Sequence, residues 1–243
     1  MNIIGVIPAR LKSTRLPGKL LIKVKGKTII ERVYENAKKA RLLKALYIAT
    51  DSREIKTVME KAGAKVIMTP ASCKSGSERI REAVKELKLS MNDVVVNIQG
   101  DEPLLEPRLI DRLVGELKRD KGCDSATLAA PIMDEKEIIN PSCVKVVVRR
   151  DSTAMYFSRA AIPYDRDGGG YSGRALKHIG VYAYRKSVLD RWAKFESSYE
   201  KIEKLEQLRL LENGCVMKVV VSKTKSIGID TPADLKKFRK AVK

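Results

Sequence analysis

Short apolar runs alternate with amphipathic segments along the first half of the chain. Consecutive apolar residues indicate buried strands, and apolar residues that recur every three or four positions indicate helices. This pattern predicts strands at residues 3–9, 45–50, 65–68 and 94–98 and helices at residues 28–41, 52–62 and 77–89. Ser52 and Ser77 are expected to cap the second and third of these helices. Strands that alternate with helices favour a three-layer α/β fold with a mostly parallel central sheet.

The second half of the chain is richer in strand patterns. We expect strands at residues 144–150, 154–157, 178–184 and 216–222 and helices at residues 202–212 and 231–242. Residues 164–174 contain three consecutive glycines and are expected to form a mobile loop. Because no repeat or linker interrupts the pattern, we predict a single domain over residues 1–243 with a smaller β-rich lobe inserted near residues 131–185.

The composition excludes several classes of protein. Apolar residues make up 44% of the chain, which is enough to fill a core and argues against intrinsic disorder. No run approaches the ~18 apolar residues that a membrane helix needs, so we expect no membrane partner. The four cysteines are widely spaced and there is one histidine, so no zinc pattern is present. Such cysteines are typical of buried thiols in a reducing cytoplasm, where we expect the protein to work.

The net charge of +19, from 49 basic and 30 acidic residues, indicates an anionic partner. A nucleic-acid-binding protein is the alternative from another class. It would need basic residues interleaved with stacking aromatics or a recognised motif. Aromatic residues are only 5% of the chain, with Trp192 as the single tryptophan, so we expect no nucleic acid. Abundant Lys and Glu with few Gln also fit heat adaptation, a second cause of high charge.

The loop after the first predicted strand concentrates positive charge. Residues 1–30 hold seven basic side chains and no acidic one, and several of them lie between Pro8 and Lys19. The loop has neither the spacing of a Walker loop nor that of a dinucleotide-binding fingerprint. Backbone N–H groups with Arg and Lys side chains form a cradle suited to polyphosphate. The alternative for such a loop is an ordinary solvated surface.

Two aspartates are candidate metal ligands. Asp101 follows the strand at residues 94–98, after a glycine, and Asp230 precedes the helix that starts at Thr231-Pro232. Ligands of open α/β sheets bind outside the carboxyl ends of the strands. A carboxylate that faces a polyphosphate can hold Mg²⁺, which takes one or two carboxylates together with phosphate oxygens. The alternative for either aspartate is a helix cap or a turn.

Eight ordered segments then resemble one family, the 3-deoxy-manno-octulosonate (Kdo) cytidylyltransferases, also called CMP-Kdo synthetases. They are residues 7–19 (IPARLKSTRLPGK), 49–51, 75–79, 96–103 (VNIQGDEP), 156–164, 177–184, 205–214 and 228–235. Leu20 departs from the family pattern, which usually has Pro there, and residues 165–174 match nothing in it. Asp165-Arg166-Asp167 mimics the metal motif of glycosyltransferases, but it lies outside the matching segments and we interpret it as a decoy.

The resemblance implies a nucleotidyltransferase with a Rossmann-like, GT-A-like fold. Such an enzyme transfers CMP from CTP to the anomeric hydroxyl of Kdo and releases pyrophosphate, with Mg²⁺ as cofactor. Family members are homodimers, and the lobe near residues 131–185 would serve sugar binding or dimerisation. An amino analogue of Kdo or another 2-keto-3-deoxy sugar acid remains open as the acceptor.

The resemblance also assigns the nucleotide-binding residues. Arg10 and Lys19 would bind the phosphates and stabilise the leaving pyrophosphate, and Asp101 and Asp230 would hold Mg²⁺. The other nucleotide-binding residues are implied to be Pro8, Ala9, Arg15, Ser75, Gly76, Arg79 and Gln99.

The sugar acid would be bound mainly by residues of the second half of the chain. They are implied to be Arg159, His178, Tyr182, Glu206 and Gln207, with Gln99 shared between the two substrates. His178 and Tyr182 taken singly could each be core residues. Glu206 and Gln207 are neighbours on a predicted helix, about 100° apart, so one of them faces partly away from any single ligand.

Overall fold

The computed structural model describes residues 1–11, 16–168, 170–171, 173–223 and 228–242. The chain forms two compact units. Met1–Asp111 and Lys225–Lys243 make up the first unit, and Arg112–Thr224 make up the second. The boundary falls within helix α4 (Pro107–Arg119). The predicted lobe near residues 131–185 lies within the second unit, and its role stays a prediction.

A parallel sheet forms the centre of the first unit. Its strands are β1 (Ile3–Ala9), β4 (Ala45–Thr50), β5 (Lys65–Met68) and β6 (Val94–Asn97). β1 pairs in parallel with β6 on one side and β4 on the other, and β4 pairs in parallel with β5. All four residues of β6 are buried, as expected for a strand that is covered on both faces.

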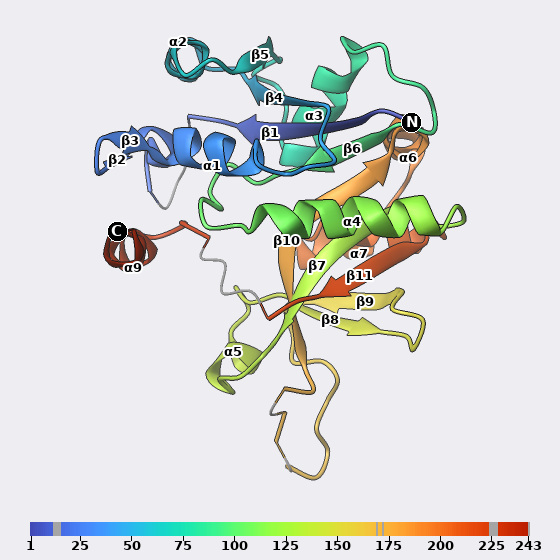
Figure 1. Cartoon of the computed structure of the whole chain (residues 1–243). Helices are drawn as coiled ribbons and strands as arrows, with labels where there is room; N and C mark the ends of the chain where they lie inside the picture. Colours follow the sequence, from blue (N-terminus) through green and yellow to red (C-terminus); the bar gives the residue numbers. More distant parts are fainter. Residues whose placement is uncertain (12–15, 169, 172, 224–227, 243) are drawn as a thin grey trace. The chain divides into compact units, whose positions relative to one another are not determined.

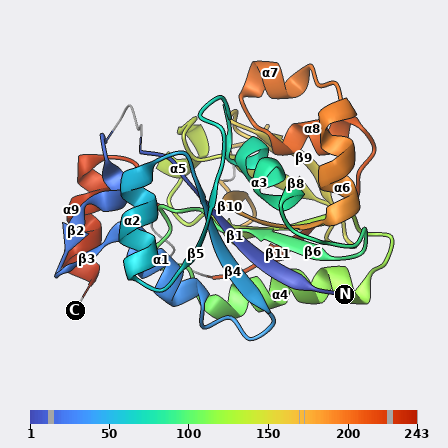
Figure 2. The same ribbon diagram turned by 90° about the horizontal axis from the view of Figure 1, so that it is seen from above.

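Helices cover both faces of this sheet. They are α1 (Ile29–Ala37), α2 (Arg53–Lys61) and α3 (Gly76–Lys85). The C-terminal segment adds a further helix, α9 (Pro232–Ala241), to this unit. α1 and α3 lie on opposite faces (Figures 1 and 2). A short 3₁₀ helix, η1 (Lys19–Leu21), and a two-stranded hairpin, β2 (Lys23–Val24) and β3 (Lys27–Thr28), precede α1. The predicted three-layer α/β class is confirmed.

Side-chain caps fix where these helices begin. Ser52 caps α2, as predicted, because its hydroxyl accepts a hydrogen bond from the amide of Ile55. The prediction that Ser77 caps the next helix is wrong. The capping hydroxyl is that of Ser75, two residues earlier, and it accepts from the amide of Glu78. Thr231 caps α9 in a capping box, with a proline in the first turn.

The second unit contains both parallel and antiparallel pairs. Its strands are β7 (Ser125–Pro131), β8 (Lys145–Val148), β9 (Ala154–Ser158), β10 (Leu176–Arg185) and β11 (Met217–Val221). β7 pairs in parallel with β11 and antiparallel with β10, and β8 pairs antiparallel with both β10 and β9. Four of these strands match predicted ones. β7 was not predicted, because its small residues (SATLAAP) lack a strong β-type signal.

The helices of the second unit are short. They are α5 (Lys136–Ile139), α6 (Lys186–Arg191), η2 (Trp192–Lys194), α7 (Tyr199–Glu203) and α8 (Gln207–Glu212). The prediction of one helix over residues 202–212 is wrong. Lys204 adopts a left-handed conformation with φ of 54°, which ends α7, and α8 starts three residues later. Glu206 and Gln207 therefore stand at the beginning of a helix.

Among the described residues, no helix combines the length and the apolar character that crossing a membrane requires. The four cysteines are all free thiols, with Cys123 and Cys215 buried and Cys73 and Cys143 partly exposed. In the predicted loop, the carboxylate of Asp165 accepts hydrogen bonds from the amides of Gly168 and Gly170. This carboxylate is engaged with its own loop, which agrees with its interpretation as a decoy.

Candidate active site

Three segments of the first unit meet at the carboxyl end of β1. A Cβ atom placed on Gly100 would lie 3.2 Å from the carbonyl oxygen of Pro8, and one on Gly76 would lie 3.6 Å from the Pro8 ring. A larger residue than glycine at position 100 would crowd this backbone. The loop after β6 and the start of α3 therefore both pack against Pro8. Three of the predicted nucleotide-binding positions, Pro8, Gly76 and the neighbourhood of Gln99, come together at this edge of the sheet.

The ammonium group of Lys19 lies between two carboxylates at the same edge. Its Nζ atom is 2.5 Å from Oδ2 of Asp101 and 2.9 Å from Oδ1 of Asp230. The backbone amide of Ile229 also donates to the carbonyl of Asp101, which ties the segment before α9 to the loop after β6. Three predicted catalytic residues that are far apart in the sequence thus form one cluster.

Electrostatics keep the Lys19 side chain charged. Burial by itself would lower its pKa, because desolvation disfavours the ammonium form. The attraction and hydrogen bonds of Asp101 and Asp230 together outweigh burial, and the pKa of Lys19 is raised above its ordinary value. The two carboxylates therefore share a fixed positive charge.

The same pair of carboxylates fits a divalent cation. They already converge on one cation, the Lys19 ammonium, and their hard oxygen atoms are the ligands that Mg²⁺ prefers. Within the part of the chain that the structure describes, no group of three or more Asp, Glu, His or Cys side chains is placed to hold a metal. A metal at Asp101 and Asp230 would accordingly complete its shell with phosphate oxygens and water.

The other predicted phosphate ligands lie in the loop after β1. Ala9 is buried as the last residue of β1, and Arg10, the next residue, is exposed. Arg10 is therefore placed at the strand end, where a polyphosphate would bind. Arg15 lies outside the described residues.

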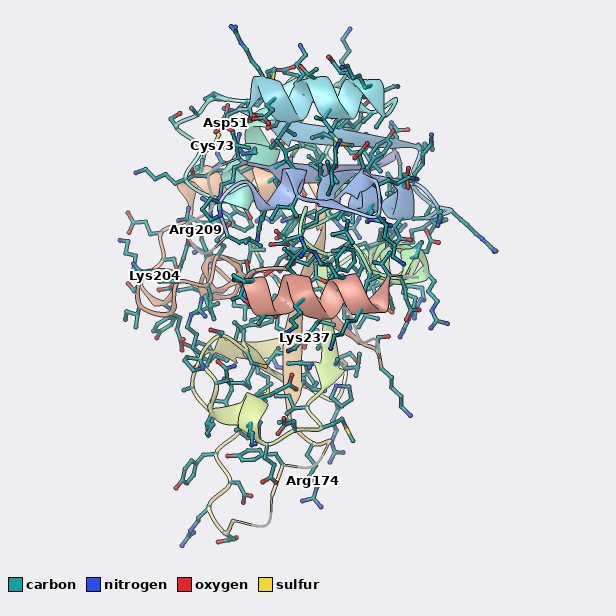
Figure 3. All side chains as sticks on the ribbon, turned by 90° about the vertical axis from the view of Figure 1, so that its left-hand side faces the viewer. Asp51, Cys73, Arg174, Lys204, Arg209 and Lys237 are labelled. Carbon is teal, nitrogen blue, oxygen red and sulfur yellow. The ribbon has the colours of Figure 1, made fainter. Side chains whose placement is uncertain are left out.

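Arg79 is held inside the protein. Its side chain is 4% exposed and donates to the carboxylate of Asp51 at 3.0 Å and to the hydroxyl of Thr69 at 2.6 Å. Asp51 follows β4 directly and lies beside Cys73 (Figure 3). Our sequence reasoning gave Asp51 and Thr69 no role, although both come just after a parallel strand. Arg79 is thus fixed in place at the start of α3, and its contact with nucleotide stays a prediction.

A polar cluster in the second unit contains three of the predicted sugar-binding residues. The hydroxyl of Tyr182 donates to Oε1 of Gln207 at 3.1 Å, and Nε2 of His178 lies 2.9 Å from the hydroxyl of Thr127. The rings of His178 and Tyr182 pack at 5.3 Å between centroids, and Phe157 stands edge-on to His178. His178 and Tyr182 therefore share one face of β10 with Gln207 at the start of α8.

Burial keeps both ring side chains of this cluster uncharged. It lowers the pKa of His178 to about 3, because the imidazolium form would lose its hydration among aromatic rings. It raises the pKa of Tyr182, and the negative charge of Glu206 adds to this effect. A neutral imidazole and a protonated phenol can donate and accept hydrogen bonds but add no net charge.

The amide group of Gln207 is only half satisfied. Its oxygen accepts from Tyr182, while its Nε2 atom is buried and has no hydrogen-bond partner among the described residues. An unpaired buried donor is costly and rare in proteins. A water molecule or a ligand oxygen that reaches this position would satisfy the donor. Glu206, the preceding residue, is partly exposed.

Arg159 is anchored to the backbone around it. Its guanidinium donates to the carbonyl of Glu203 at 2.7 Å and to the carbonyl of Pro141 at 2.8 Å. In the first unit, the side chain of Gln99 donates to Asn97 at 3.4 Å. Both residues are in defined orientations, and their predicted contacts with the sugar acid stay predictions.

Comparison with known proteins identifies the family to which the chain belongs. A family model described as cytidylyltransferase matches residues 4–227. The chain belongs to the cytidylyltransferase family. Two relatives are each 44% identical to this cytidylyltransferase, and each alignment covers 97% of its chain. One is the 3-deoxy-manno-octulosonate cytidylyltransferase of Syntrophobacter fumaroxidans, of which the alignment covers 94%. The other is the 8-amino-3,8-dideoxy-manno-octulosonate cytidylyltransferase of Shewanella pealeana, of which it covers 96%.

A solved structure supports the same assignment. This cytidylyltransferase superimposes on a CMP:2-keto-3-deoxy-manno-octonic acid synthetase in complex with CTP with a TM-score of 0.93. The two sequences are 37% identical, and the match covers 99% of this chain and 98% of the other. The predicted nucleotidyltransferase fold is thereby confirmed over nearly the whole length.

The protonation state of His178 gives a direct prediction. Because it is the only histidine, its ring protons are assigned in a proton NMR spectrum without further labelling once any affinity tag has been removed. We expect the Cε1 proton shift to stay constant from pH 8 to pH 5, since the folded-state pKa is about 3. The urea-unfolded chain is the control and should titrate near the ordinary value of ~6.5. A midpoint between pH 6 and pH 7 in the folded protein would contradict the burial argument.

Proposed function

We propose that the protein transfers CMP from CTP to the anomeric hydroxyl of Kdo and releases pyrophosphate. The observation that carries this proposal is the convergence of Lys19, Asp101 and Asp230 at the strand ends of a cytidylyltransferase. The full-length similarity to relatives that act on Kdo-type acids supports the acceptor.

The first unit supplies the groups for nucleotidyl transfer. The anomeric oxygen attacks the α-phosphorus of CTP, the bond from that phosphorus to the bridging oxygen of the β-phosphate breaks, and pyrophosphate leaves while the hydroxyl proton passes to solvent. Arg10 and Lys19 bind the β- and γ-phosphates and stabilise the charge that develops on the leaving group. Asp101 and Asp230 hold Mg²⁺. When bound, the metal neutralises phosphate charge and lowers the pKa of a nearby hydroxyl.

The cytosine end of CTP is assigned to the backbone around Ala9 and to the start of α3. Cytosine presents an amino donor beside a carbonyl acceptor, and backbone groups can pair with both. The fixed guanidinium of Arg79, the Ser75-Gly76 turn and Gln99 complete this part of the proposed site. Arg15 is proposed as an additional phosphate ligand on the sequence resemblance alone.

The sugar acid is assigned to the cluster of the second unit. Its hydroxyls match the free donor of Gln207 and the neutral side chains of Tyr182 and His178. Its carboxylate matches the guanidinium of Arg159, and Glu206 is placed to accept from a sugar hydroxyl. A cluster that is uncharged except at its edge suits a polyol with one carboxylate.

An amino analogue of Kdo is the second candidate acceptor. The relative from Shewanella pealeana that is named for 8-amino-3,8-dideoxy-manno-octulosonate is as similar to this chain as the one named for Kdo. Overall identity therefore does not separate the two acids. Kdo remains the primary proposal because the structural relative that matches with a TM-score of 0.93 is named for it.

We further propose that the enzyme is a cytoplasmic homodimer. Four free thiols suit a reducing compartment. Within the second unit, Met133, Ile139 and Tyr164 each expose more than three quarters of their surface, which is unusual for large apolar residues and favours a protein partner.

The pyrophosphate assay tests the proposed function. Release of pyrophosphate should require CTP, Mg²⁺ and Kdo together and should stop with EDTA. UTP and GTP serve as nucleotide controls, and 8-amino-Kdo and sialic acid as acceptor controls. If the enzyme prefers 8-amino-Kdo, this acid replaces Kdo as the proposed acceptor. If no acid supports pyrophosphate release, the proposed function is overturned.

Asp101→Asn tests the metal-binding carboxylates. The substitution keeps the shape of the side chain and removes its charge, so we expect kcat to fall by about 100-fold or more with little change in melting temperature. Asp167→Asn, in the exposed motif interpreted as a decoy, is the matched control and should retain wild-type activity. Equal activity of the two variants would remove Asp101 from the site.

A further inference from the structure

Lys145 is a completely buried lysine in the second unit, where nothing above gives it a function. The residue has 0% exposure and is among the largest fully buried side chains of the chain. Its Nζ atom donates to the backbone carbonyls of Cys143 and Arg159, each at 2.6 Å, and of Asn140 at 3.0 Å. Lysine is almost never fully buried unless its charge is well compensated. Three converging carbonyl dipoles supply that compensation.

These three carbonyls come from two segments. Asn140 and Cys143 belong to the turn between α5 and β8, and Arg159 follows the last residue of β9. Burial lowers the pKa of the Lys145 ammonium, while the charge of Glu203 works in the opposite direction. The side chain therefore joins the turn to the end of β9 at Arg159, the residue proposed to bind the sugar carboxylate.

Glu203 holds the same residue from the other side. Its carboxylate accepts from the backbone amide of Arg159 at 2.9 Å and from the hydroxyl of Ser158 at 2.5 Å. The carbonyl of Glu203 also accepts from the Arg159 guanidinium at 2.7 Å. Lys145 thus fixes the C=O group of Arg159, and Glu203 fixes its N–H group. α7, which ends at Glu203, packs against α8, and α8 packs against β9.

The same strand also connects to His178. In the sheet register Lys145 stands opposite Ser158 on one side and Lys177 on the other. The amide of His178 donates to the carbonyl of Val144 at 2.8 Å. Lys145 therefore lies between the strands that lead to Arg159 and His178, two of the proposed sugar-acid ligands. Lys145 itself holds the backbone of Arg159, and Val144, the residue before Lys145, holds the backbone of His178.

We propose that Lys145 and Glu203 form a clamp that positions Arg159 for the carboxylate of the sugar acid. Neither clamp residue touches substrate, so both are positioning residues. The clamp rests on the proposed function, because it assigns Arg159 to the acceptor. A small displacement of a group that orients a substrate has a large effect on catalysis.

Lys145→Met and Glu203→Gln test the clamp. Each removes one side of it and keeps the approximate size of the side chain. We expect KM for Kdo to rise about tenfold or more in either variant, with KM for CTP unchanged. Lys218→Met and Glu212→Gln are matched controls in the same unit. Lys218 also donates to a backbone carbonyl, and Glu212 also accepts from a serine hydroxyl and a backbone amide.

Arg159→Lys shows whether the effect passes through the arginine. In that background, Lys145→Met should add little further increase in KM for Kdo, because the two changes act on one contact. If Lys145→Met unfolds below the assay temperature, Glu203→Gln and its double variant with Arg159→Lys carry the comparison. Melting temperatures of all variants are measured in parallel.

The outcomes separate the clamp from the proposed function. If the wild-type protein does not turn over Kdo, the proposed function fails. If it does, and the folded variants keep the wild-type KM for Kdo, the clamp is overturned. An equal rise in the KM values of both substrates, or an additive effect in the double variants, would show a general structural role and would also overturn the clamp.

Discussion

Two carboxylates that face the same small space require a cation between them, and the first unit is organised around this constraint. Asp101 comes from the loop after β6, and Asp230 comes from the segment before α9. The Lys19 ammonium, from the region after β1, lies within 3 Å of both. Like charges at this separation repel strongly in a partly buried site, so removal of the cation is unfavourable. The cluster links three segments that are far apart in the sequence, and in the proposed function its two carboxylates also hold Mg²⁺.

In the second unit a buried charge is compensated by backbone carbonyls and not by a pair of carboxylates. Backbone carbonyls pair with two of its cationic side chains: three carbonyls with Lys145, and those of Pro141 and Glu203 with Arg159. Satisfied networks of this kind hold side chains in one arrangement. Two buried polar atoms of this unit lack a partner among the described residues, the amide nitrogen of Gln207 and the hydroxyl oxygen of Ser125. Of these two, the Gln207 nitrogen belongs to the cluster to which the sugar acid is assigned in the proposed function.

Much of the fold and the nucleotide site could be predicted from local patterns. The apolar runs before Pro8 and Asp101 mark buried strands, and the carboxyl ends of parallel strands meet, so Lys19 and Asp101 were expected to be close. Hydrogen bonds between a side chain and the backbone cannot be predicted from such patterns. Nothing in the sequence shows that Lys145 binds carbonyl groups or that Lys204 turns left-handed and divides the predicted helix at residues 202–212. The sequence did not distinguish Ser75 from Ser77 as the cap of α3, because the two serines lie only two residues apart.

The requirement for a cation between Asp101 and Asp230 is tested most directly by the melting temperature of Lys19→Met with and without Mg²⁺. Without a divalent ion the variant leaves the carboxylates facing each other, so it should melt below the wild-type protein. Mg²⁺ binds the folded variant in place of the ammonium and should raise its melting temperature more than that of the wild type. Lys27→Met, which removes an exposed ion pair with Glu35, is the control and should respond to Mg²⁺ as the wild type does. A Lys19→Met protein that melts like the wild type and does not respond to Mg²⁺ would contradict this account.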